Sequence, residues 1–306
     1  MATDLMPDAS SVGERDDLLH EIQKRVLWLS INMVDHANRI RKSPGGVKVG
    51  GHQASSSSVV TIMTYLYFEY MRAGDRISVK PHASPVFHAI QYLLGNLDAE
   101  YLTTLREFHG LQAYPSRTKD PDGVDFSTGP VGIGAVAPNF AWLAEEYVRN
   151  HLNEDSGVGR RFISLVGDAE LDEGVVWEGI ADPALEGLEN ALWVVDLNRQ
   201  SLDRIIPGIR ADVWRQMFDA NGWNVIQVRH GAVRRAAFAK PGGDDLKRVL
   251  EEGFSDYELQ ILLLLQDAAQ TRKALEQQQS EAQQEMTAVR TEREHYATLL
   301  TQLEQQ

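Results

Sequence analysis

The stretch Phe162-Ile163-Ser164-Leu165-Val166-Gly167-Asp168-Ala169 is an apolar run that ends on a carboxylate. A second apolar run, over 191–197, is followed directly by Asn198. If both runs are parallel strands, their carboxyl ends meet at one edge of a sheet, where a carboxylate and an amide oxygen offer hard oxygen ligands to a divalent cation such as Mg²⁺. The pair alone has another explanation, because Asp and Asn at strand ends are often turn residues.

Strand and helix patterns alternate around these two runs. Apolar spacing predicts helices over 18–41, 56–71, 85–94, 96–107, 129–150, 174–187 and 211–220. Strands are predicted over 161–167, 191–197 and 223–229. This alternation indicates an α/β fold, a parallel sheet with helices on both faces.

Composition limits the class of protein. The chain of 306 residues is 43% apolar, which supports one large α/β domain with an appendage. A formal charge of −14 argues against nucleic acid or an anionic membrane surface as a partner. The absence of cysteine excludes disulfides and thiolate chemistry. No apolar run approaches the roughly 18 residues of a membrane span, so we expect a cytoplasmic protein.

Three segments are expected along the chain. Residues 1–17 are polar without a clear period, which predicts a flexible arm, and residues 18–255 form the α/β domain. Residues 260–306 predict a helical tail, and apolar side chains near heptad spacing indicate a coiled coil and self-association as a dimer. A solvated helix with frayed ends is the alternative. The heptad positions are Leu275, Ala282, Met286, Val289, Tyr296, Leu300 and Leu303, with Gln279 and Arg293 as imperfect steps.

A glycine-rich turn and two histidines add polar chemistry. The segment 127–134 begins with Ser127, Thr128 and Gly129 and precedes an amphipathic helix, an arrangement that lets backbone N–H groups approach phosphate oxygens. A tight connection is the simpler explanation of such a turn. His52 and His82 each lie in a small-residue loop before a helix, where they could act as acids near neutral pH or only cap and pack. His88, by contrast, has no such context, and we expect it to be structural.

The segment from Gly167 to Asn198 resembles the thiamine diphosphate motif of the transketolase and 2-oxo-acid dehydrogenase superfamily. The loops around His52 and His82, and the segment 111–116, are similar to the first domain of homodimeric-type pyruvate dehydrogenase E1 components. This resemblance covers about residues 18–254. It implies a thiamine-diphosphate-binding fold and the cofactors thiamine diphosphate and Mg²⁺.

Residue roles follow from the resemblance by position. It implies that Asp168, Asn198 and the backbone carbonyl of Gln200 ligate Mg²⁺, and that His52 and His82 are catalytic residues facing the diphosphate and the substrate. The cofactor-binding residues that it implies are Ser127, Thr128, Gly129, Gly167, Asp168, Ala169, Glu170 and Asn198. Two positions depart from the family pattern: Ala169 replaces the usual glycine, and Asp196 stands where asparagine is common.

The resemblance implies the diphosphate-binding part of an E1-like enzyme, an oxidoreductase component that decarboxylates a 2-oxo acid and passes the acyl group to lipoamide. A second subunit would then carry the pyrimidine-binding domain, whose glutamate activates the cofactor, and a lipoyl-bearing acyltransferase would be a further partner. We expect no activity from this chain alone. Two alternatives stay open: a truncated, non-catalytic E1-like protein with an oligomerising or regulatory role, and a transketolase-type subunit. The second would need a basic phosphate clamp, which the sequence does not reveal.

Overall fold

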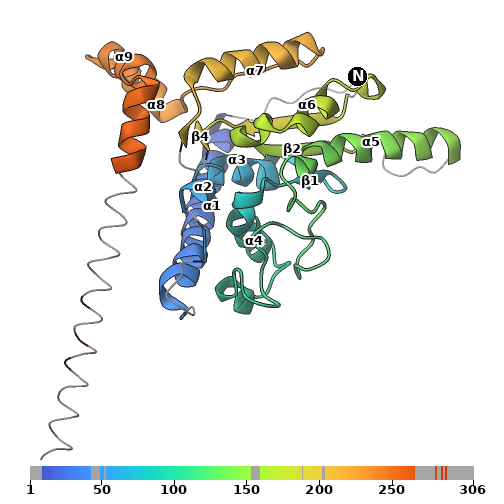
Figure 1. Ribbon diagram of the computed structural model, residues 1–306, viewed down its shortest axis with the longest axis horizontal. Coiled ribbons are helices and arrows are strands. Elements are labelled where there is room, and N and C mark those ends of the chain that lie inside the picture. Colours follow the sequence, from blue (N-terminus) through green and yellow to red (C-terminus); the bar gives the residue numbers. More distant parts are fainter. Residues whose placement is uncertain are drawn as a thin grey trace, which may run out of the picture. The chain divides into compact units, whose positions relative to one another are not determined.

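The computed structural model describes residues 9–42, 49–51, 53–152, 159–187, 189–201 and 204–265, and the single positions 280, 284 and 287. The chain divides into two compact units, whose elements Figure 1 labels. The first unit comprises Met1–Arg199 and Ile209–Val225, and the second comprises Gln200–Gly208 and Ile226–Gln306.

The first unit contains a parallel sheet of three strands in the order β1-β2-β3. The strands are β1 (Arg76–Ser78), β2 (Phe162–Gly167) and β3 (Ala191–Asp196). Gly167 pairs with Asp196 in the register, so β2 and β3 end at the same level. The predicted parallel sheet is therefore confirmed.

Helices account for most of the remaining first unit. The α-helices are α1 (Ala9–Asp35), α2 (Gln53–Ser57), α3 (Val60–Tyr65), α4 (Ser84–Leu93), α5 (Ile133–Leu152), α6 (Gly174–Ile180) and α7 (Gly208–Ala220). Two π-helical turns, η1 (His36–Ile40) and η3 (Leu66–Tyr70), extend α1 and α3. Short 3₁₀ turns are η4 (Pro81–Ala83), η5 (Ala99–Thr103), η6 (Asp168–Asp172) and η7 (Pro183–Leu185).

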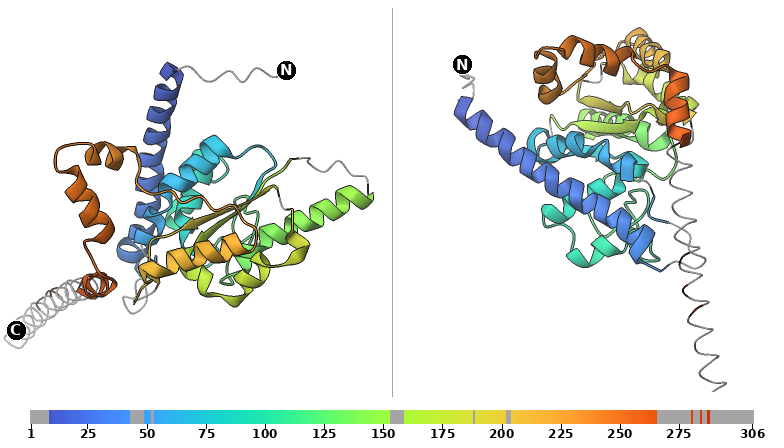
Figure 2. Two further views of the ribbon diagram at one scale, coloured as in Figure 1. Left: turned by 90° about the horizontal axis from the view of Figure 1, so that it is seen from above. Right: turned by 90° about the vertical axis from the view of Figure 1, so that its left-hand side faces the viewer.

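The helices cover both faces of the sheet. On one face, Ile163 and Leu165 join a buried apolar cluster with residues of α1, α3 and α4, and Figure 2 shows α1 running along these helices. On the other face, the hydroxyls of Ser78 and Ser164 contact α5. Successive strand side chains point to opposite faces, so Ser164, which lies between Ile163 and Leu165 in β2, faces α5 while its two neighbours face the apolar cluster.

Two serines of the sheet position the start of α5. Pro138 lies inside this helix and has no N–H to donate to the Gly134 carbonyl one turn earlier. The Ser78 hydroxyl donates to that carbonyl at 2.5 Å, and the Ser164 hydroxyl donates to the Ala135 carbonyl at 2.7 Å, both within the buried interior. The helix start that follows the glycine-rich turn is thereby fixed to β1 and β2.

Ser78→Ala is expected to lower the free energy of unfolding by about 1–3 kcal/mol, because the buried Gly134 carbonyl loses its donor. Adding Pro138→Ala should recover much of this loss, since the new backbone N–H at position 138 can donate to the same carbonyl. Urea denaturation of both variants checks this. The control Ser57→Ala removes an exposed hydroxyl and should change stability by less than about 0.5 kcal/mol. Equal changes in stability for Ser57→Ala and Ser78→Ala would contradict the role of the Ser78 hydroxyl as the donor to the Gly134 carbonyl.

Three predictions need correction. The helix predicted over 96–107 is limited to the 3₁₀ turn η5. Helix α1 begins at Ala9, inside the expected arm, and continues without a break into the predicted amphipathic helix. The prediction of a flexible arm over 1–17 is therefore wrong from Ala9 onward, whereas residues 1–8 lie outside the described residues. The strand predicted over 223–229 does not form, and the segment is irregular.

The second unit contains β4 (Gln200–Ser201) and β5 (Arg204–Ile205), which pair antiparallel, and the helices α8 (Ala232–Phe238) and α9 (Gly243–Glu252). Residues 256–265 are also helical, and the Gln260 side chain accepts a hydrogen bond from the backbone N–H of Ile205 at 2.7 Å. Beyond 265, only positions 280, 284 and 287 are described, as helical. The heptad residues lie outside the described residues, so the coiled coil stays a prediction. None of the described helices is long and apolar enough to cross a membrane.

Candidate functional site

The carboxyl ends of β2 and β3 bring the predicted metal ligands to one edge of the sheet. Asp168 opens η6 directly after β2, and its side chain is buried, with 1% of its surface exposed. The backbone N–H of Arg199, the residue after Asn198, donates to a carboxylate oxygen of Asp168 at 2.6 Å. Arg199 has a left-handed backbone (φ 60°), which turns the loop after β3 toward Asp168.

The environment of Asp168 disfavours its charge. Burial raises the pKa of Asp168 to about 6, and the neighbouring Asp196 adds to this rise. Hydrogen bonds from the backbone N–H groups of Arg199 and Ala169, together with the positive charge of Lys80, oppose it. The carboxylate therefore lies where a bound cation would stabilise its ionised form.

Lys80 is a residue of this edge that the sequence analysis did not identify. Its ammonium lies 2.7 Å from a carboxylate oxygen of Asp196, and the Ser58 hydroxyl donates to the same oxygen at 2.6 Å. The two charged side chains are 6% and 9% exposed. Asp196 departs from the family pattern, and Lys80 balances the charge that it adds. The sequence signal for Lys80 is its place directly after the segment Ile77-Ser78-Val79, but the strand β1 is too short to be predicted from sequence.

Asn198 lies next to this pair. Its amide nitrogen is 3.5 Å from the Asp196 carboxylate, at the limit of a hydrogen bond. Gln200 belongs to the second unit, so the role of its carbonyl as a ligand stays a prediction. The structure thus brings Asp168 and Asn198 to one edge, as predicted from the two strand ends.

The glycine-rich turn lies beside the segment after β2. A carboxylate oxygen of the buried Glu170 accepts a hydrogen bond from the backbone N–H of Gly167 at 2.9 Å, and the N–H of Gly132 also donates to Glu170. Burial raises the pKa of Glu170 despite these bonds. Gly132 has φ +81° and no room for a side chain, because an added Cβ would lie 2.8 Å from Val175. Glu170 therefore joins the two loops as a structural bridge.

The residues before this turn differ in their environment. Thr128 is buried, and its hydroxyl has no hydrogen-bond partner in the described part of the chain. The Ser127 hydroxyl accepts a hydrogen bond from the backbone N–H of Arg117 at 3.0 Å. Gly129 is exposed, and open space lies where a side chain would project.

Of the two predicted catalytic histidines, only His82 can be described. Its side chain is exposed between the buried Pro81 and Ala83, and its ring meets the Tyr114 ring edge-on with centroids 5.6 Å apart. His82 also lines a small pocket. His52 lies outside the described residues, although Gly51 before it lines the same pocket.

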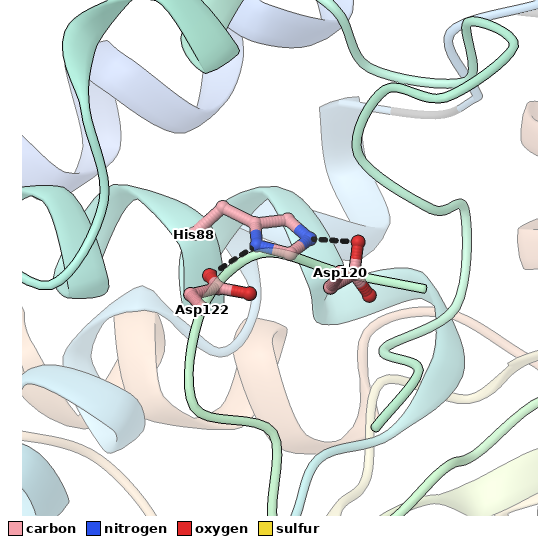
Figure 3. Close-up of side chains that lie close together, drawn as sticks. All are labelled: His88, Asp120 and Asp122. Atoms are coloured by element: carbon pink, nitrogen blue, oxygen red, sulfur yellow. Dashed lines mark hydrogen bonds and ion pairs between the residues drawn. The ribbon is translucent and has the colours of Figure 1, made fainter. Parts of the chain in front are cut away.

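A second polar cluster holds the loop that carries Tyr114. Figure 3 shows His88 of α4 between Asp120 and Asp122 of that loop, and all three side chains are fully buried. The His88 ring lies 2.6 Å from Asp122 and 3.8 Å from Asp120. Both carboxylate oxygens of Asp120 also accept backbone N–H groups, from Gln112 and Ser116. Although the ligand atoms lie within 4.8 Å of one another, these bonds indicate a clamp on the loop rather than a metal site.

Comparison with known proteins agrees with the predicted family and fold. Residues 69–239, more than half of the chain, match the family described as transketolase, thiamine diphosphate binding domain. The chain is 29% identical over 233 residues to the pyruvate dehydrogenase E1 component of Mycobacterium tuberculosis, covering 71% of this chain and 24% of that protein. The chain is also 29% identical over 227 residues to the pyruvate dehydrogenase E1 component of Escherichia coli K12, and this match covers 71% of this chain and 25% of that protein. The chain thus spans about a quarter of these relatives.

Solved transketolases share the fold. The transketolase of Leishmania mexicana superposes with a TM-score of 0.59 at 19% identity, over 78% of this chain and 35% of that one. A transketolase variant from Pichia stipitis gives a TM-score of 0.57 at 22% identity, and this match covers 69% of this chain and 31% of that one. The predicted cofactor, thiamine diphosphate with its usual partner ion Mg²⁺, is confirmed at the level of the family. The chain belongs to the family of the transketolase thiamine diphosphate binding domain.

Proposed function

We propose that this chain binds the diphosphate of thiamine diphosphate through Mg²⁺ at the edge formed by β2 and β3, as part of a pyruvate dehydrogenase E1-like enzyme. The observation that carries the proposal is the convergence of Asp168 and Asn198 at the ends of two adjacent parallel strands. The E1 components among the relatives support this class of enzyme.

The charges at this edge suit a divalent cation. Its buried carboxylates, those of Asp168, Glu170 and Asp196, outnumber its one buried ammonium, that of Lys80. Since Lys80 is paired with Asp196, Asp168 has no cation of its own at ion-pair distance among the described residues. Asp168 and Asn198 would hold Mg²⁺ with oxygen ligands, and the Gln200 carbonyl would be the third protein ligand.

The diphosphate would lie against the glycine-rich turn. The open space at Gly129 leaves room for phosphate oxygens near the backbone, and the unpartnered hydroxyl of Thr128 offers a donor. Ser127 would line the same side. Ala169 replaces a glycine, but its backbone N–H is retained and can donate.

When bound, thiamine diphosphate supplies a carbon nucleophile for the carbonyl of a 2-oxo acid and accepts the electrons left when CO₂ departs. Beside it, His82 would hold a proton near the substrate, and we propose the same role for His52. The pyrimidine-binding part of the enzyme would come from a second polypeptide. We also propose that this chain associates with a second copy of itself. Transfer of the acyl group to lipoamide would require a lipoyl-bearing acyltransferase.

Calorimetric titration of the full chain with thiamine diphosphate tests the proposal. Binding is expected in the presence of Mg²⁺ and should disappear when EDTA removes the metal ion. No heat of binding at millimolar cofactor would reject the half-site, and a non-catalytic oligomerising or regulatory role would then be favoured.

Metal affinity should also depend on pH. With a pKa of about 6, Asp168 is almost fully ionised at pH 7.5 but only about one quarter ionised at pH 5.5. Since the metal binds the ionised form, the apparent dissociation constant should rise about fourfold between these two pH values. Titration with Mn²⁺, followed by electron paramagnetic resonance in the absence of cofactor, measures this change. Equal affinity at both pH values would mean that Asp168 is not a ligand.

A further inference from the structure

A small pocket of the first unit contains a cationic side chain, Arg106, that has no counterion among the residues the structure describes. Arg106, His82, Ser56 and Ser84 are among the residues that line it. Arg106 is partly buried, and its guanidinium has no hydrogen bond or ion pair within the described part of the chain. The adjacent Glu107 does not balance it, because Glu107 pairs with Arg41 at 3.3 Å.

The backbone holds Arg106 in an unusual conformation. Its φ of 61° lies in the left-handed region, which arginine seldom adopts. The Arg106 N–H donates to the carbonyl of Leu111 at 2.7 Å, and this bond closes the turn between the two residues. Strained residues of this kind cluster at ligand-binding sites.

The glycines opposite Arg106 leave space for its guanidinium. A Cβ on Gly51 would lie 3.0 Å from a terminal nitrogen of Arg106. Asn38, in the π-helical turn η1, fixes these glycines: its amide nitrogen donates to the Gly51 carbonyl at 3.0 Å, and its amide oxygen accepts from the Gly50 N–H at 2.6 Å. The guanidinium thus packs over a glycine backbone that another side chain holds in place.

We propose that this pocket binds a carboxylate through Arg106, with His82 beside it, and that the carboxylate is that of the 2-oxo acid substrate. Ser84 already donates its hydroxyl hydrogen to the Ala113 carbonyl, whereas the Arg106 guanidinium has no partner within the described ranges and is left to bind an anion. A guanidinium presents paired N–H groups that match the two oxygens of a carboxylate. The identity of the carboxylate as the substrate's rests on the proposed function, whereas the binding of an anion by the pocket does not.

Titration of the full chain with pyruvate, without cofactor or metal, tests the inference. Arg106→Gln should weaken pyruvate binding by about tenfold or more, because a charge-assisted hydrogen bond is lost, and Arg106→Lys should weaken it less. The control Arg72→Gln removes an exposed arginine outside this pocket and should bind pyruvate as the wild type does. Inorganic phosphate, the probe for a phosphate ligand, should bind more weakly than pyruvate.

A chemical measurement locates the anion without any variant. Phenylglyoxal should modify Arg106, and pyruvate should protect this arginine but not Arg72, as read by mass spectrometry. The inference is overturned if the wild type does not bind pyruvate, if Arg106→Gln binds it equally well, or if phosphate binds more tightly. The proposed function fails separately if the wild-type chain shows no Mg²⁺-dependent binding of thiamine diphosphate while it still binds pyruvate.

Discussion

Asp168→Asn is expected to weaken Mg²⁺-dependent binding of thiamine diphosphate by at least about 100-fold. The substitution keeps the size of the side chain and one oxygen, but it removes the charge that holds the metal ion. The loss should appear in calorimetric titrations with Mg²⁺, beside the control Asp212→Asn on the exposed side of α7. The control is expected to bind the cofactor as the wild type does.

The same variant should not lose stability in the absence of metal. The pKa of Asp168 is raised in the folded state, so its ionised form opposes folding at pH values above about 6 and ceases to do so as the pH falls toward 4. An uncharged asparagine avoids this cost. We therefore expect the metal-free variant to melt at the wild-type temperature or above it at pH 7.5. A lower melting temperature together with lost binding would mean that Asp168 is chiefly structural.

Lys80→Met is expected to lower the free energy of unfolding by about 3–5 kcal/mol. The substitution leaves Asp196 buried and charged without its partner, since both side chains are at most 9% exposed. Adding Asp196→Asn should restore most of the stability, because the uncharged amide needs no counterion and can accept the Ser58 hydroxyl. Denaturant unfolding of the two single variants and the double variant gives the coupling energy directly.

An exposed ion pair provides the control for this cycle. Arg248 and Asp245 lie 3.0 Å apart with 69% and 78% of their side chains exposed. The corresponding variants Arg248→Met and Asp245→Asn should change stability by less than about 1 kcal/mol and show little coupling. If the cycle of Lys80 and Asp196 gives an equally small coupling, the pair is not what balances charge at this edge.

The part of the site predicted from sequence depends on long strands. Strands β2 and β3 each have six residues bounded by polar positions, so their ends, and with them Asp168 and Asn198, could be located. Strand β1 has three residues, which is too few for a pattern, and Lys80 beyond its end was therefore missed. Arg106 was missed for another reason: its proposed role depends on a pocket that residues far apart in the sequence assemble.

The failed predictions have local causes. The segment 223–229 has the composition of a strand, but its apolar side chains do not become buried. Ile226 and Val228 remain 78% and 89% exposed instead. The cluster around His88 could not be predicted, because Asp120 and Asp122 reach α4 only through a long irregular loop.

The most direct test of the magnesium site is a crystal structure of the full chain soaked with Mn²⁺ and thiamine diphosphate. The anomalous difference map should show one Mn²⁺ peak between the Asp168 carboxylate and the side-chain oxygen of Asn198, next to the diphosphate. A peak between His88, Asp120 and Asp122 instead, or cofactor density away from the ends of β2 and β3, would contradict the proposed site.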